Sequence, residues 1–258
     1  MKFTKTIALA LAAGVVASAA FAEEEANTVG AYAGTVLKNG YISNGYLFAD
    51  DFVLQSYAGV TFGGFDLNIW NSWDIEKSHF GDAAAANEID YELDYGFSAE
   101  DFDFGLGVAA WDYPNSDGDN PDEWVAKASV AYTALPIRPE LNARFGLHGQ
   151  QGCYGQFKLS KGFDLSEDVC EGLSADVYGL IGLASKSYRK GKGEDKDGLV
   201  DAEFGAKLTY ALGDNASINA GVQYAVIVDS DLRDCCSSTQ ADGDKDHFMY
   251  FAGADIWF

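Results

Sequence analysis

Carboxylates at two-residue spacing are the groups in this sequence with the clearest capacity for chemistry. From Glu88 to Asp94 an acidic residue stands at every second position, with Ile89, Tyr91 and Leu93 between them. In an extended strand such residues share one face, and neighbouring carboxylates lie about 7 Å apart. Other segments carry charges in the same alternating pattern. The candidates for a charged inner wall are Asp66, Glu88, Asp90, Glu92, Asp94, Asp103, Lys127, Arg144, Lys158 and Lys207.

Rows of charges tune ion selectivity when they line a water-filled pore. The acidic candidates come from three consecutive segments and the basic ones from later segments, so the two groups could face each other across a closed barrel. A second interpretation is that salt bridges and water fill the lumen and close it. Acids outnumber bases among these positions, so an open pore is expected to prefer cations mildly.

Metal and catalytic chemistry are less well supported. The acidic runs 115–119 and 242–246 have oxygen ligands that suit calcium, but neither has a Glu at the twelfth position of an EF-hand loop, so we expect solvated loops. Of the histidines, His79 adjoins Ser78 and His247 adjoins Asp246. Neighbours on a strand point to opposite faces, so these pairs argue little for catalysis. The third histidine is His148. We predict no catalytic residue, no metal site, no cofactor and no enzymatic activity.

Strands of alternating apolar and polar residues must position the charged candidates. The clearest are 65–74 and 88–97, and similar rows run through 102–108, 141–147, 200–210, 218–228 and 248–258. Weaker ones near 28–43, 52–62, 123–133, 153–163 and 173–187 bring the total to about twelve, each close to the length a tilted membrane strand needs. The predicted fold is all-β, an antiparallel transmembrane β-barrel.

Three features indicate a membrane barrel whose apolar face meets lipid on the outside. They argue against a soluble barrel whose apolar face fills the interior. Tight turns such as Gly63-Gly64 alternate with the long polar links 75–87, 113–122, 189–197 and 230–246. Aromatic residues cluster where strands are expected to end, including Trp73, Tyr113, Trp124, Tyr188 and Tyr250 beside the long links. Phe258 closes an apolar row at the C-terminus, and we interpret it as the signal that the barrel assembly machinery recognises.

The N-terminus predicts export. Lys2 and Lys5 precede a short apolar run, and Ala20-Phe21-Ala22 is an A-x-A cleavage site, so we expect a signal peptide over 1–22 and one barrel domain over 23–258. Cleavage would remove two of the 17 basic residues and none of the 40 acidic ones, so the mature chain would have a net charge of about −25. Such a chain is repelled by nucleic acid. The expected location is the cell outer membrane of a Gram-negative bacterium, in contact with lipid and lipopolysaccharide.

The stretch from Gly45 to Val130 resembles the TorF family of porins. The resemblance rests on Gly45-Tyr46, on the run GGFDLNIWNSW from Gly63 to Trp73, and on Trp111-Asp112-Tyr113-Pro114. Asn44 stands where the family pattern has Arg, so no role is carried over to that position. The resemblance implies an outer-membrane channel and supplies no catalytic or binding residues.

Two functions remain open from the sequence. The first is a narrow passive channel for small hydrophilic solutes or ions, and the second is a non-conducting barrel that displays acidic loops for adhesion or envelope integrity. A bore free of inward loops would favour the channel, whereas a loop folded into the bore would favour the structural role.

Exported chains permit disulfides. A spanning strand would place Cys153 and Cys170 too far apart to bridge, and Cys153 could instead reach Cys235 or Cys236.

Overall fold

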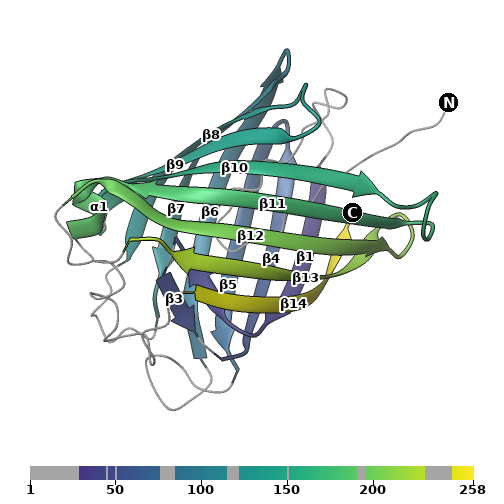
Figure 1. Cartoon of the computed structure of the whole chain (residues 1–258), viewed down its shortest axis with the longest axis horizontal. Coiled ribbons are helices and arrows are strands. Elements are labelled where there is room, and N and C mark those ends of the chain that lie inside the picture. The colour runs from purple at the N-terminus through teal and green to yellow at the C-terminus, as the bar shows by residue number, and fades with distance from the viewer. Residues whose placement is uncertain are drawn as a thin grey trace.

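A computed structural model describes residues 29–44, 46–49, 51–75, 85–114, 122–149, 151–190, 196–229 and 246–258. Within these residues twelve strands form a closed antiparallel barrel (Figure 1), in the order β1-β14-β13-β12-β11-β10-β9-β8-β7-β6-β5-β4, and β4 pairs again with β1. The predicted fold class is therefore confirmed. The barrel strands are β1 (Gly30–Lys38), β4 (Val53–Phe62), β5 (Phe65–Asp74), β6 (Ala85–Ala99), β7 (Phe102–Asp112), β8 (Glu123–Tyr132), β9 (Arg138–His148), β10 (Gly152–Asp164), β11 (Leu173–Ala184), β12 (Gly198–Ala211), β13 (Ala216–Ile227) and β14 (Asp246–Trp257).

The outer face of the barrel is apolar and the inner face is polar. Along β5 the exposed Leu67 and Ile69 alternate with the inward Asp66 and Asn68, and the other strands repeat this pattern. A continuous apolar surface of this kind matches the hydrocarbon of a bilayer. It includes Leu54, Val60, Leu93, Leu106, Val108, Leu141, Phe145, Leu159, Ile181, Phe204, Leu208, Ile218 and Val222.

The two ends of the barrel differ in their connections. At one end, here the short-turn end, lie the turn at Gly63 and Gly64, the start of β1 and the C-terminus. Both glycines have positive φ, which the tight turn requires. At the opposite end, the long-link end, lie the connections from β1 to β4 and from β11 to β12. Exposed aromatic residues mark the short-turn end, as expected: Phe62, Phe65, Phe97, Phe102 and Tyr210.

Two of the expected outer aromatic residues do not face lipid. Trp73, Trp124 and Tyr250 are exposed as predicted, but Tyr188 is buried on α1 (Lys186–Lys190) and packs against the inward Tyr154 in a tilted arrangement, with ring centroids 5.5 Å apart. Tyr113 packs against inward residues of β7 and β8. The prediction that aromatic residues at the strand ends face lipid was wrong for these two, because the chain turns toward the bore after the strands end.

Two strands are shorter than the alternation predicted. The segment expected over 28–43 leaves the barrel wall after Lys38, and its last residues form a separate hairpin of β2 (Tyr41–Ser43) and β3 (Tyr46–Ala49). The segment expected over 173–187 ends at Ala184. There the Ser185 hydroxyl accepts a hydrogen bond from the Tyr188 amide, and the Ser185 carbonyl accepts one from Arg189, so α1 begins.

The terminal strand closes the barrel. β14 pairs with β1 on one side and β13 on the other, in registers that include Thr35 with Ala254 and Ile218 with Ala254. The backbone of Phe258 exchanges hydrogen bonds of 2.8 and 3.2 Å with Ala31. Closure pairs both edges of every barrel strand, which a bilayer requires. None of the described helices is long and apolar enough to cross a membrane.

Candidate functional site

The bore of the barrel is the candidate site, and all ten charged candidates point into it. They occupy the inward positions of β5, β6, β7, β8, β9, β10 and β12, alternating with residues that face outward. Asp66, Glu88, Lys127, Arg144 and Lys158 are buried, and the others are half-buried. These positions agree with the face that strand periodicity assigns to the charged residues, and their lining of an open pore stays a prediction.

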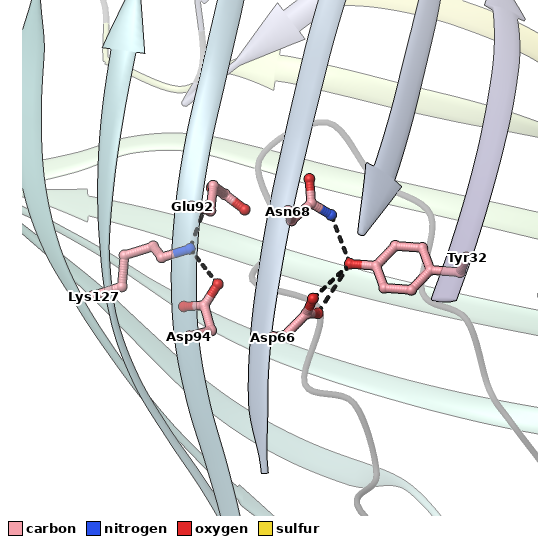
Figure 2. A network of polar contacts seen from close by, with 6 residues as sticks. All are labelled: Tyr32, Asp66, Asn68, Glu92, Asp94 and Lys127. Atoms are coloured by element: carbon pink, nitrogen blue, oxygen red, sulfur yellow. Dashed lines mark hydrogen bonds and ion pairs between the residues drawn. The ribbon is translucent and has the colours of Figure 1, made fainter. Parts of the chain in front are cut away.

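A network of six inward residues lies on the wall made by β1, β5, β6 and β8 (Figure 2). The Tyr32 hydroxyl donates to Asp66 at 2.9 Å and accepts a hydrogen bond of 2.7 Å from the amide nitrogen of Asn68. Beside them the Lys127 ammonium lies 3.2 Å from Glu92 and 2.8 Å from Asp94. Glu92 and Asp94, both on β6, therefore share the Lys127 ammonium.

A glycine on the intervening strand makes this ion pair possible. Gly107 of β7 stands in register with both Asp94 of β6 and Lys127 of β8. A Cβ at position 107 would lie 1.9 Å from the Asp94 carboxylate. Because glycine has no side chain, the lysine can reach across β7. The Lys127 side chain is 2% exposed, whereas those of Glu92 and Asp94 remain 24% and 17% exposed.

Tyrosines that bind carboxylates recur around the bore, and the sequence analysis did not identify them. Each of five inward tyrosine hydroxyls donates to an inward acid: Tyr32 to Asp66, Tyr41 to Glu88, Tyr57 to Asp255, Tyr154 to Asp201 and Tyr178 to Glu203. A hydrogen bond to a charged group contributes about 1.5–3 kcal/mol to the stability of the folded protein. These contacts hold the acidic side chains against the wall.

The glycine pattern could have revealed these tyrosines. Tyr32 stands in register with Gly59, and Tyr57 with Gly34, on the paired strands β1 and β4. Tyr178 stands in register with Gly205 on β12. In each pair the tyrosine ring occupies the space that a Cβ on the facing glycine would need. A tyrosine at an inward position opposite a glycine is therefore a sign of a ring that lies along the wall.

The basic residues do not form a wall of their own. Lys127 pairs with the acidic side of the bore, Lys207 lies 3.7 Å from Asp176 of the neighbouring strand, and the Lys158 ammonium lies 5.6 Å from the Tyr178 ring centroid. Acidic residues also occur on this side of the barrel: Glu140, Asp176, Asp201, Glu203 and Asp255. The expected opposition of an acidic and a basic wall is replaced by local pairing, because neighbouring strands bring opposite charges close together.

The hairpin of β2 and β3 lies inside the bore toward the long-link end. Tyr41 and Ile42 are each 3% exposed. The Tyr41 hydroxyl donates to Glu88 at 2.6 Å, and Asn44 accepts a hydrogen bond of 2.9 Å from the Arg144 guanidinium. Burial, and secondarily the Glu88 charge, raises the pKa of Tyr41 well above its usual value, so its hydroxyl keeps the proton it donates. A loop folded into the bore, the feature that would favour the structural role, is therefore present at this end.

A second element covers part of the same end. On α1 the Arg189 side chain is fully buried and its guanidinium lies 2.6 Å from Asp229. Tyr188 belongs to an apolar cluster with Tyr154, Ala184, Val200 and Ile227, and Phe48 of the hairpin packs against that cluster. The hairpin and the α1 region are thus joined by apolar contacts at the long-link end.

The remaining candidates are only partly described. His148 is exposed at the end of β9, and His247 points inward while its neighbour Asp246 points outward and accepts a hydrogen bond from Tyr224. Cys153 and Cys170 are free thiols, as their separation predicts for that pair. His79, Cys235, Cys236, the acidic run 115–119, residues 242–245 of the second acidic run, and the signal peptide over 1–22 lie outside the described residues.

Comparison with known proteins relates the barrel to solved outer-membrane channels. It is similar to a KdgM porin with a TM-score of 0.51 and 9% identity, over 88% of this chain and 98% of that one. It is also similar to an outer membrane channel from Pseudomonas putida F1, with a TM-score of 0.53 and 12% identity, over 92% and 98% of the two chains. No family model and no curated protein matches the chain. The chain therefore has the fold of outer-membrane porins.

Proposed function

We propose that this protein is a narrow porin-like channel of the outer membrane, through which small hydrophilic solutes or ions diffuse passively. The observation that carries the proposal is the charged and polar inner face of a closed barrel whose outer face is apolar. Burying many charges in a barrel interior is costly unless water or partners are close. An aqueous path is the simplest reason for such an interior. The fold shared with a KdgM porin and with an outer membrane channel supports it.

We further propose a mild preference for cations. Glu88, Asp90, Glu92 and Asp94 follow one another along β6. At about 7 Å spacing their potentials add, because the Debye length is about 8 Å at physiological salt. Lys127 offsets part of this charge at Glu92 and Asp94. Acidic side chains also recur on the opposite side of the bore, so the net field favours cations.

The TorF resemblance of residues 45–130 agrees with this proposal. Its segments GGFDLNIWNSW and Trp111-Asp112-Tyr113 map onto β5 and the end of β7, which contribute Asp66, Ser72, Asp74 and Trp111 to the bore. We propose that the chain is a TorF-type porin that inserts through the barrel assembly machinery and contacts lipid and lipopolysaccharide.

Conductance in a planar bilayer tests both statements. The refolded protein should conduct, and under a salt gradient its reversal potential should have the sign of cation preference, more strongly at low salt. The double variant Asp90→Asn, Glu92→Gln should move the reversal potential toward the non-selective value. The matched control is Glu100→Gln, Asp214→Asn, which removes the same charge from exposed turns and should change little. An anion-selective pore, or equal effects of the two variants, would contradict the selectivity proposal.

A non-conducting barrel is the second candidate, and the hairpin inside the bore is the observation that favours it. Local charge pairs such as Lys127 with Asp94 also neutralise part of the charge on the inner wall. In this role the acidic links would serve adhesion or envelope integrity. Complete absence of conductance from correctly folded protein, including a variant without the hairpin, would establish the second candidate over the first.

A further inference from the structure

We propose that the β2–β3 hairpin is the gate of the channel: it closes the bore from inside, and it leaves this position when solute passes. The inference rests on the proposed channel function. It begins from the position of the hairpin, whose three β2 residues Tyr41, Ile42 and Ser43 are all buried although they belong to a connection between two wall strands. A connection that extended from the barrel would expose such residues.

The hairpin contacts the wall on several sides. Tyr41 packs with Val53 of β4 and Trp70 of β5, and Ile42 packs with Ala225 of β13 and Met249 of β14. Phe48 packs against the cluster around Tyr154 and Val200, which belong to β10 and β12. Strands on opposite sides of the barrel thus touch one small hairpin. It therefore spans the bore from one side to the other at this depth.

The ends of the hairpin are fixed to the wall. The Asn39 backbone donates to the Tyr250 carbonyl, and the Asn39 side-chain oxygen accepts a hydrogen bond of 2.7 Å from the Tyr250 amide. At the other end the Phe52 carbonyl accepts a hydrogen bond of 3.0 Å from Ile75. Between these anchors lie Gly40 and Asn44, and Asn44 has a φ of 53°. The moving unit is thus the segment between residues 39 and 52.

The polar contacts that hold the hairpin in the closed position can open at a low cost in free energy. Tyr41 binds the Glu88 carboxylate and Asn44 binds the Arg144 guanidinium, so each contact joins a charged wall group to an uncharged hairpin group. A buried charge regains hydration when such a contact opens, which offsets much of the lost hydrogen bond. Apolar packing of Tyr41, Ile42 and Phe48 favours the closed position. These opposing contributions allow both positions to be populated.

Tethering the hairpin tests the gate. In a background with all four cysteines changed to Ser, Ile42→Cys and Ala225→Cys are joined by a short, reducible bis-thiosulfonate crosslinker. Current through single channels in a planar bilayer should fall at least tenfold and return after reduction. The control pair, Leu208→Cys with Ala220→Cys, stands in register on the outward face of β12 and β13, and its crosslinking should leave the current unchanged.

Weakening one contact gives the opposite test. Tyr41→Phe removes the hydrogen bond to Glu88 and should raise the open probability by about tenfold or more. Tyr224→Phe removes the same kind of contact, to Asp246, on the outward face and away from the hairpin, and should not change gating. Replacing 41–49 by a short Gly-Ser link should give a larger, steadily open conductance.

The outcomes separate the gate from the channel. If the wild type conducts and neither the tether nor Tyr41→Phe changes the current, the gate is refuted and the channel stands. If only the variant without the hairpin conducts, the hairpin is a fixed plug and the gate is again refuted. If no variant conducts although all show the heat-modifiable mobility of folded barrels, the channel function itself fails.

Discussion

At the scale of single residues, glycine and tyrosine act as pairs on the inner wall. Tyr32 lies across the facing Gly59, and its hydroxyl reaches Asp66. The ring can occupy this place only because position 59 has no Cβ. The glycine at position 59 therefore determines where the Tyr32 hydroxyl, and with it the Asp66 carboxylate, lies in the bore.

Gly59→Ala should destabilise the barrel. The new Cβ would lie 2.4 Å from the end of the Tyr32 ring, so the ring must shift and its bond to Asp66 is disturbed. We expect a loss of about 1–3 kcal/mol in the free energy of unfolding, as for other overpacked sites. The measurement is the urea midpoint of the refolded protein in detergent.

Gly155→Ala is the matched control. The nearest atom to its new Cβ is the Asn142 carbonyl oxygen at 3.4 Å, an ordinary contact. Its free energy of unfolding should stay within about 1 kcal/mol of the wild-type value. Alanine allows the unfolded chain fewer conformations than glycine, and this offsets any small strain in the folded protein. Equal losses for the two variants would show that the ring and glycine are not coupled.

At the scale of elements, the terminal strand β14 decides whether the barrel closes. Its outward row ends at Phe258, a residue that is 76% exposed in the folded protein. Its backbone nevertheless pairs with Ala31 of the first strand. The side chain is therefore better placed to act during assembly than in the finished fold.

Deleting Phe258, or changing it to Asp, should leave unfolded protein in the periplasm, because the terminal signal and the apolar row are lost. Phe258→Tyr keeps the aromatic ring and should assemble normally. Heat-modifiable mobility of outer-membrane fractions measures the result. Normal assembly of Phe258→Asp would show that Phe258 is not the signal.

At the scale of the whole molecule, the unequal ends predict the orientation. We expect the long-link end outside the cell and both ends of the mature chain in the periplasm, as short periplasmic turns and long outer loops are usual for such barrels. Protease added to intact cells should cut within 113–122 or 230–246 and spare the turn at Gly63 and Gly64. Fragment masses identify the sites, and cleavage restricted to the short turns would invert the orientation.

The sequence by itself predicted a barrel of about twelve strands and the face of each strand on which the charged side chains lie. These follow from alternation, since a period of two residues assigns every side chain to one face. The ten charged candidates needed no tertiary information to be placed on the inner face. The same reasoning predicted that the terminal row ending at Phe258 belongs to a wall strand.

Only the tertiary structure decided what fills the bore. Residues 41–43 continue the apolar pattern of β1, so local sequence could not distinguish a wall strand from a hairpin that turns inward. The partners of Tyr41 and Asn44 lie 47 and 100 residues away, at Glu88 and Arg144. The pairing of Lys127 with Asp94 depends likewise on the register of three strands and on Gly107 between them. Alternation assigns a face to each residue, but contacts across the bore arise only when the barrel closes.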